Sequence, residues 1–454
     1  MLLLLTACRP NSSKTADGAS NSKPTVTTVD ANRIDGHPDW IMQGNIYEVN
    51  LRQYTAEGTF TAFEKNFDRL KEMGVQTMWF MPINPISKVD RKGALGSYYA
   101  VADYNNVNPE YGTMADWIAL VKHAHSLGIK VIIDWVPNHT GADHYWLKMH
   151  PDFYVKDSIT GKPVSPFDWT DTRKLNYKNM EMQDSMINCL NGWIKNSDID
   201  GFRCDVAGDV PDSFWTRCIS ELRKTKSDIF MLAEADKPSL HKDGFDATYP
   251  WATFDMMKKV AKGVRPASAL DSVRNTIDST YPANALKMMF TSNHDENSWN
   301  KADYGTMPGA VHAPFAVYTF TAGRSVPLIY SGQEEPVMDS ISFFYKDQIK
   351  FGKYNRAKFY KTLIDLRKSN VALAANASFK KVVVGDEKAV YAFTREAAGK
   401  KVLVILNLSG KEQTIKVTDP SLQGEPYNVF MYTREPLKET PWKLEAWGFV
   451  IYVY

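Results

Sequence analysis

Residues 61–81 read TAFEKNFDRLKEMGVQTMWFM, and this stretch sets the pattern for most of the chain. Apolar residues recur at helical spacing from Thr61 to Met73, which predicts an amphipathic helix. Gly74 stands where a glycine commonly ends a helix, and the apolar run 75–81 predicts a buried strand. The order of helix, glycine and strand recurs along the chain. We therefore expect a parallel sheet covered by helices.

Working outward, eight segments have the length and apolar content of strands. They are residues 44–50, 75–81, 129–134, 201–206, 229–234, 244–248, 287–290 and 326–330, of which 244–248 has the weakest pattern. Eight strand–helix units predict an α/β protein with a (β/α)8 barrel, the TIM-barrel architecture, over residues 39–373.

Two segments interrupt the rhythm. Residues 140–180 have little helical period and several prolines and glycines, which predicts a loop-rich insertion after the third strand. After about residue 374 the pattern changes to short alternating strands, such as 388–394 and 401–407. These predict a C-terminal antiparallel β-sandwich domain over residues 374–454.

Composition excludes some classes of partner. The chain has 54 Lys and Arg against 52 Asp and Glu, a net charge of +2, which gives no reason to expect a nucleic-acid partner. The four cysteines are too few for a disulfide framework.

The N-terminus resembles a bacterial lipoprotein signal. A short apolar run ends in Leu5-Thr6-Ala7-Cys8, as in a lipobox, where the cysteine is lipidated. Residues 9–38 are polar, as expected of a disordered tether. We therefore expect residues 1–8 to be the remnant of a signal, Cys8 to carry a lipid, and the protein to be anchored to a membrane of the cell envelope, periplasmic or outer-membrane. The alternative is a cysteine that stands there by chance.

Polar side chains follow several predicted strands. The third strand ends in Asp134, the fourth in Arg203 and Asp205, and the fifth in Glu234, while the seventh runs into Asn293-His294-Asp295. Barrel enzymes keep their active sites at this edge of the sheet, so these side chains are expected to share one cleft. Clustered like charges cost free energy and raise at least one pKa, so such clusters usually serve catalysis.

Glycosidic bond cleavage requires this kind of set. One carboxylate attacks the anomeric carbon, and Arg203 beside Asp205 is expected to keep that carboxylate ionised. A second carboxyl must be protonated to assist the leaving oxygen. Metal-assisted chemistry is the alternative, although the spacing of the candidate ligands lacks a tight metal motif. Those candidates are Asp134, His139, Asp205, Glu234 and His294.

Four motifs in order resemble those of the α-amylase family of glycoside hydrolases. They are Asp134-Trp-Val-Pro-Asn138-His139, Gly201-Phe-Arg203-Cys-Asp205, Met231-Leu-Ala-Glu234 and Phe290-Thr-Ser-Asn293-His294-Asp295. The resemblance covers nearly the whole chain from about residue 40, and in it the insertion is "domain B" and the C-terminal domain "domain C".

The resemblance implies roles for these residues. It assigns Asp205 as the nucleophile, Glu234 as the acid/base and Asp295 as the third catalytic carboxylate. Tyr99, after Gly96-Ser97-Tyr98, resembles the tyrosine that stacks on the cleaved sugar. The remaining substrate-binding residues are expected to be Asp134, His139, Arg203 and His294. The expected substrate is an α-1,4-linked glucan or maltooligosaccharide, with no cofactor needed for the chemistry.

Calcium is a separate expectation. Asn138 matches a usual ligand of the family's structural calcium, but Asp209 replaces the His or Lys that many members carry four residues after the nucleophile. Lys174-Leu175-Asn176 resembles the version of neopullulanase and cyclomaltodextrinase relatives, or is an ordinary loop turn. Three other functions stay open: a transglycosylase, an isomerase, and a catalytically inactive glucan-binding lipoprotein, the last disfavoured by the retained carboxylates.

Overall fold

The computed structural model describes residues 32–301, 305–336, 339–437 and 439–454. The predicted signal remnant, Cys8 and residues 9–31 of the predicted tether lie outside these ranges. Among the described residues, no helix has the length and apolar character needed to cross a membrane.

The eight predicted parallel strands form a closed barrel, which confirms the fold class. In sequence order they are β3 (Ile46–Val49), β4 (Thr77–Phe80), β5 (Lys130–Trp135), β8 (Gly201–Cys204), β9 (Phe230–Ala233), β10 (Ala247–Thr248), β11 (Leu286–Met289) and β12 (Ser325–Tyr330). The ring is closed by pairing between β12 and β3, and the order around it follows the sequence.

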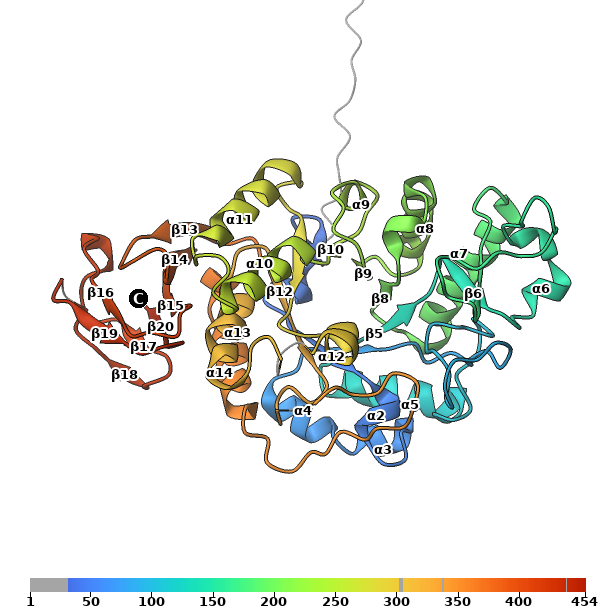
Figure 1. The fold of residues 1–454 in the computed structure, drawn as a ribbon, viewed down its shortest axis with the longest axis horizontal. Coiled ribbons are helices and arrows are strands. Elements are labelled where there is room, and N and C mark those ends of the chain that lie inside the picture. The colour runs from blue at the N-terminus through green and yellow to red at the C-terminus, as the bar shows by residue number, and fades with distance from the viewer. Residues whose placement is uncertain (1–31, 302–304, 337–338, 438) are drawn as a thin grey trace, which may run out of the picture. The chain divides into compact units, whose positions relative to one another are not determined.

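Helices on the outside connect these strands or follow the last of them (Figure 1). They include α5 (Met114–Ser126), α7 (Met180–Ser197), α8 (Asp212–Thr225), α10 (Trp251–Ala261), α11 (Ala269–Thr280), α13 (His312–Thr321) and α14 (Ala357–Ser369). The single helix predicted over 61–73 is wrong in one respect, because it is divided into α3 (Phe60–Glu64) and α4 (Phe67–Met73). Asn66 causes the break, since its side chain donates to the Phe63 carbonyl and competes with the helical pattern. Gly74 ends α4 with φ 98°, as predicted.

The segment between β5 and α7 is the loop-rich insertion. It contains a two-stranded antiparallel ribbon, β6 (His139–Gly141) with β7 (Thr172–Lys174), and the short helix α6 (Trp146–Met149). The ribbon begins at His139, so the insertion starts at the edge of the barrel where the polar strand ends gather.

An antiparallel sheet domain follows α14 (Figure 1). Its main sheet has the order β13-β14-β15-β20-β17-β18, and β16 (Gln413–Ile415) pairs with β19 (Trp442–Leu444) beside it. The main strands are β13 (Ser378–Val382), β14 (Val390–Ala397), β15 (Lys400–Asn407), β17 (Tyr427–Asn428), β18 (Thr433–Arg434) and β20 (Phe449–Val453). Successive residues of β15 alternate between two cores: Val404 packs in the cluster shared with the barrel helices, whereas Leu403 packs in a cluster made only by this domain.

The end of the predicted tether needs correction. Residues 32–38 belong to the folded chain and form β1 (Arg33–Ile34) and β2 (His37–Pro38). Their side chains supply partners for the buried carboxylate of Asp246, since Arg33 lies 2.8 Å and His37 3.0 Å from Asp246 Oδ1. A buried charge requires such partners, so this segment is fixed on the barrel.

Candidate active site

A pocket of about 430 Å³ opens where the polar strand ends meet. Its lining includes five predicted site residues: Tyr99, His139, Asp205, Glu234 and Asp295. The other predicted residues, Asp134, Arg203 and His294, are fully buried beneath it. The structure thus brings together the residues that the sequence predicted at the ends of four separate strands.

Arg203 connects the carboxylates. Its Nη1 donates to Asp134 Oδ1 and to Asp205 Oδ1, each at 2.9 Å, and its Nη2 forms an ion pair with Glu234 Oε1 at 2.9 Å. Its Nε donates to the Tyr249 hydroxyl at 3.1 Å. The rigid fork of a guanidinium allows one side chain to hold three carboxylates in fixed relative positions.

Asp205 and Glu234 form a closely coupled pair. Burial raises the pKa of Asp205 well above its usual range, the neighbouring Glu234 carboxylate raises it further, and Arg203 opposes both effects. Arg203 favours the ionised form of Asp205, as expected, but its Nη1 is shared with Asp134 and its effect on the pKa is smaller than that of burial. The two carboxyl groups therefore lie close enough for each to affect the other, and both contact the same guanidinium.

A second network holds the other side of the pocket. The Tyr99 hydroxyl donates to Asp134 Oδ2 at 3.0 Å and lies 2.7 Å from His294 Nε2. His294 Nδ1 in turn lies 2.6 Å from the Glu48 carboxylate. Burial acts to lower the pKa of His294, but the carboxylates of Asp295 and Glu48 outweigh it and the pKa lies well above 6.5. His294 is therefore an imidazolium between two carboxylates.

Glu48 is the buried member of this network that the sequence analysis missed. It lies on β3, inside the segment 44–50, and its charge is fully buried. The sequence did contain a signal for it, because Glu48 stands in a segment predicted to be a buried strand. A buried carboxylate is rare without a partner, so its presence there indicates a buried ion pair. Its partner His294 is distant in the sequence, so the pair emerges only when β3 and β11 lie in one barrel.

His139 is a neutral residue at the pocket surface. Burial lowers its pKa to about 3, so the imidazole carries no charge near neutral pH. Among the described residues, its Nε2 has no hydrogen-bond partner. A buried ring nitrogen in this state can bond a ligand hydroxyl at little cost, because it gives up no protein partner.

The calcium expectation receives no support from the neighbouring carboxylates. The Asn138 side chain lies 3.3 Å from His139 Nδ1, and the described parts of the chain contain no group of three acidic, histidine or cysteine side chains placed to hold a metal. Calcium usually takes six to eight oxygen ligands, several of them carboxylates. Asn138 therefore stays a predicted ligand.

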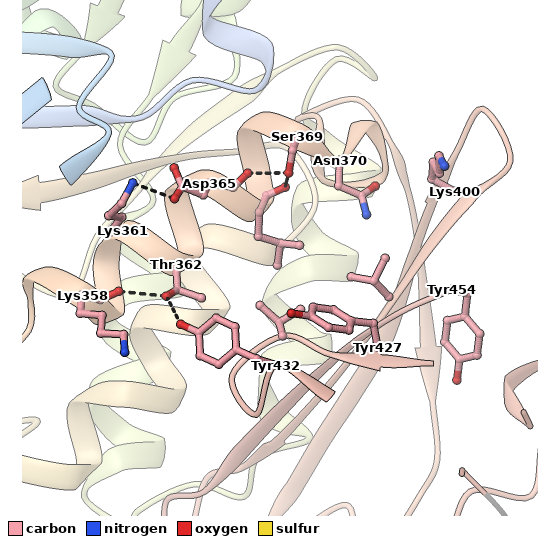
Figure 2. Close-up of a pocket in the computed structure, with 13 residues that line it drawn as sticks. Lys358, Lys361, Thr362, Asp365, Ser369, Asn370, Lys400, Tyr427, Tyr432 and Tyr454 are labelled. Atoms are coloured by element: carbon pink, nitrogen blue, oxygen red, sulfur yellow. Dashed lines mark hydrogen bonds and ion pairs between the residues drawn. The ribbon is translucent and has the colours of Figure 1, made fainter. Parts of the chain in front are cut away.

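A second pocket, of about 520 Å³, lies where α14 meets the C-terminal sheet. Figure 2 shows three tyrosines beside it, Tyr427, Tyr432 and Tyr454, of which Tyr432 faces Thr362 of α14. Several of these polar groups already bond one another, as Lys361 does with Asp365 at 2.9 Å. None of the predicted site residues lies here, so volume does not identify the active site in this protein.

Comparison with known proteins agrees with this arrangement. A family model described as "Alpha amylase, catalytic domain" matches residues 35–174, and one described as "Alpha-amylase SusG C-terminal domain" matches residues 390–451. The chain is 25% identical to the α-amylase MalA of Haloarcula japonica over 414 residues, covering 86% of this chain and 59% of that protein. It is 27% identical to a cyclomaltodextrinase of Thermoanaerobacter pseudethanolicus over 388 residues, covering 77% of this chain and 63% of that protein.

The chain therefore spans less than two thirds of the length of these two curated relatives. Among solved structures, it resembles a maltogenic α-amylase, AmyB, from Thermotoga neapolitana. The TM-score is 0.83 at 27% identity, and the match covers 91% of this chain and 99% of that one. The motifs, the barrel with its polar strand ends and these matches agree: the chain matches the α-amylase catalytic domain over residues 35–174 and is similar along most of its length to α-amylases and a cyclomaltodextrinase.

Proposed function

We propose that this protein is a retaining α-glycoside hydrolase that cleaves α-1,4-linked glucans or maltooligosaccharides by double displacement. One observation supports this most: a single guanidinium, Arg203, contacts both Asp205 and Glu234 at the wall of a pocket of ligand size. Two carboxyl groups on the same pocket wall can supply the nucleophile and the acid of such a reaction.

In the proposed first step, the anomeric carbon of the substrate enters between the two carboxyl groups. The Asp205 carboxylate attacks that carbon while Glu234 gives its proton to the glycosidic oxygen, whose bond to carbon breaks. In the second step, Glu234 takes a proton from water, the hydroxide attacks the same carbon, and the bond to Asp205 breaks. Each step inverts the carbon, so the configuration is retained.

The surrounding residues have binding roles in this scheme. Tyr99 and His139 present a ring and an unpartnered nitrogen to the sugar at the cleaved bond. The His294 imidazolium, paired with Asp295 at 3.2 Å, orients that carboxylate toward the sugar hydroxyls. Asp134 fixes Arg203 and the Tyr99 hydroxyl from below. The chemistry needs no cofactor, and a structural calcium at Asn138 would act on stability, so a chelator would lower the melting temperature.

Transglycosylation and isomerisation use the same residues and differ only in what attacks the glycosyl-enzyme. The deciding experiment follows products of maltoheptaose by proton NMR from the first minutes, with Asp205→Asn as the blank. Shorter oligosaccharides that appear first as the α-anomer support the proposal. First products of β configuration, oligosaccharides longer than the substrate, or activity on sucrose or isomaltose in place of maltoheptaose would contradict it.

We also propose that a lipid on Cys8 anchors the protein to the cell envelope; this residue lies outside the described ranges. In that case the protein partitions into the detergent phase, and Cys8→Ala moves it to the soluble fraction. An unchanged distribution of the variant would contradict the anchor.

A further inference from the structure

One end of the active-site pocket is bounded by a loop between β4 and α5. We define residues 87–97 as the end loop. Its two ends are held together, because Ile86 and Val101 form an antiparallel bridge and Ser87 N donates to the Ala100 carbonyl at 2.8 Å. Lys92 and Ser97 of this loop line the pocket, and Tyr99 follows it directly.

On one side, the end loop is fixed to the insertion. The Asp143 carboxylate accepts from the backbone N–H of Lys88 at 2.8 Å and of Val89 at 3.2 Å. Asp90 pairs with Arg173 at 2.9 Å. The loop therefore meets the insertion through its backbone as well as through its charges.

At the pocket surface, Lys92 Nζ lies 3.6 Å from Asp171 Oδ1. Both residues line the pocket, and Asp171 is 2% exposed. This ion pair therefore joins the end loop to the insertion across the pocket wall itself.

On its other side, the end loop is fixed to the segment after β12. Leu95 N donates to the Phe344 carbonyl at 3.0 Å. Gly93, with φ 65°, lies so close to Phe344 that a Cβ there would approach the Phe344 Cβ to 2.5 Å. The buried guanidinium of Arg52 donates to the carbonyls of Gly96 and Phe343, each at 3.1 Å, and so joins the two segments.

The strand order of the barrel shows where the end loop lies relative to Glu234. The loop leaves β4 and reaches a segment that follows β12, so it crosses the mouth of β3, which lies between those two strands in the ring. Glu234 follows β9, which is four strands from β3 in either direction around the ring. The end loop and the acid/base therefore lie on opposite sides of the barrel mouth.

We propose that the end loop closes the pocket on the side away from Glu234, so that the enzyme accepts only the non-reducing end of a glucan and acts from that end. The inference rests on the proposed function. Glu234 protonates the leaving group, so the leaving part of the substrate lies on the Glu234 side. The retained part extends the other way, toward the end loop, where a continuing chain would meet Lys92, Asp171 and Phe344.

The test compares two maltoheptaosides, one unmodified and one whose non-reducing glucose carries a 4,6-O-alkylidene block. Products are separated by chromatography without coupling enzymes. The wild type should cleave the unmodified substrate and leave the blocked one intact. Asp90→Ala/Lys92→Ala removes both ion pairs to the insertion and should gain cleavage of the blocked substrate. Lys88→Ala, whose side chain is exposed on the same loop, is the matched control and should behave as the wild type.

Wild-type cleavage of the blocked substrate at the unmodified rate would overturn the inference. A double variant that still spares the blocked substrate would overturn the assignment of the closed end to this loop. Failure to cleave either substrate would instead contradict the proposed function. Calorimetric binding of the two maltoheptaosides to Asp205→Asn then tests the loop without catalysis, and equal affinities would contradict the closed end.

Discussion

The two walls of the active-site pocket are built in different ways. The catalytic wall carries Asp205 and Glu234 at the ends of β8 and β9, with Arg203 buried behind them. The loop wall is made of the end loop, Trp169 and Asp171 of the insertion, and Phe343-Phe344 after β12. At the strand ends, ion pairs and hydrogen bonds offset the free-energy cost of burying charged side chains, whereas the loops determine the shape of the pocket. In the proposed function the chemistry depends on the first wall and the choice of substrate on the second, and the predictions below test that division.

The largest effect is expected in the catalytic wall at Asp205. Asp205→Asn removes the nucleophile, and kcat should fall by about 10⁴-fold or more on every substrate. Because burial already raises the pKa of this carboxyl, a neutral amide should not lower the melting temperature. Steady-state kinetics and a thermal scan of the same preparation measure both. Near-normal turnover, or an unfolded variant, would contradict this role.

Arg203→Lys should give the next largest effect. Lysine keeps the charge but cannot hold three carboxylates in the geometry of the guanidinium, so kcat should fall by about 10² to 10³-fold. Asp134, whose pKa burial raises to about 6 against the effect of Arg203, should become harder to ionise. The acid limb of the pH–kcat profile should then move to higher pH. A pH profile and a kcat like those of the wild type would show that a positive charge at residue 203 is sufficient for activity without the geometry of the guanidinium.

A smaller effect of another kind is expected in the loop wall. Trp169 lines the pocket, and its ring lies 5.3 Å from that of His139. Trp169→Ala should raise KM about tenfold with little change in kcat, since loss of an aromatic contact weakens ground and transition state alike. Phe167→Ala is the control, because the Phe167 ring contacts that of Trp169 at a centroid distance of 4.7 Å but does not line the pocket. A fall in kcat with unchanged KM would place Trp169 in the catalytic wall.

The smallest effect concerns stability in acid. Burial lowers the pKa of His144 in the insertion to about 3, against a weaker opposing effect of Asp143. Below pH 6.5 the unfolded chain therefore binds a proton that the folded chain does not, and the free energy of unfolding falls as pH decreases toward 3. His144→Asn keeps an acceptor for the Trp146 N–H, found at 3.2 Å, and removes the titration.

The variant should lose less stability between pH 5.5 and 4.5, by about 1.4 kcal/mol per pH unit. Urea titrations of both proteins at the two pH values measure this difference. Parallel losses in the two proteins would show that His144 does not titrate in this way.

The sequence predicted the catalytic wall better than the loop wall, for a physical reason. Apolar runs and the residues that end them are local features, and the barrel brings strand ends together whatever the loops do, so Asp134, Asp205 and Glu234 could be placed in advance. The break at Asn66 and the ordered residues 32–38 depend on side-chain bonds that periodicity does not report.

The pairing of Glu48 and the contacts of the end loop could not be predicted, because the partners are distant in the sequence. Glu48 is recognised as part of the site through its contact with His294. The end loop is recognised through its contacts with Asp143, Arg173 and Phe344. Such pairs are specified by the closed barrel and not by any pattern within a segment.

The division of labour between Asp205 and Glu234 is tested most directly by azide rescue of Glu234→Gln with α-glucosyl fluoride. Fluoride leaves without protonation, so the variant should form the glycosyl-enzyme and then stall for lack of a base. Azide needs no base, so it should restore turnover and give the α-glucosyl azide, the product of two inversions. A β-glucosyl azide, or rescue of Asp205→Asn in place of Glu234→Gln, would contradict the account.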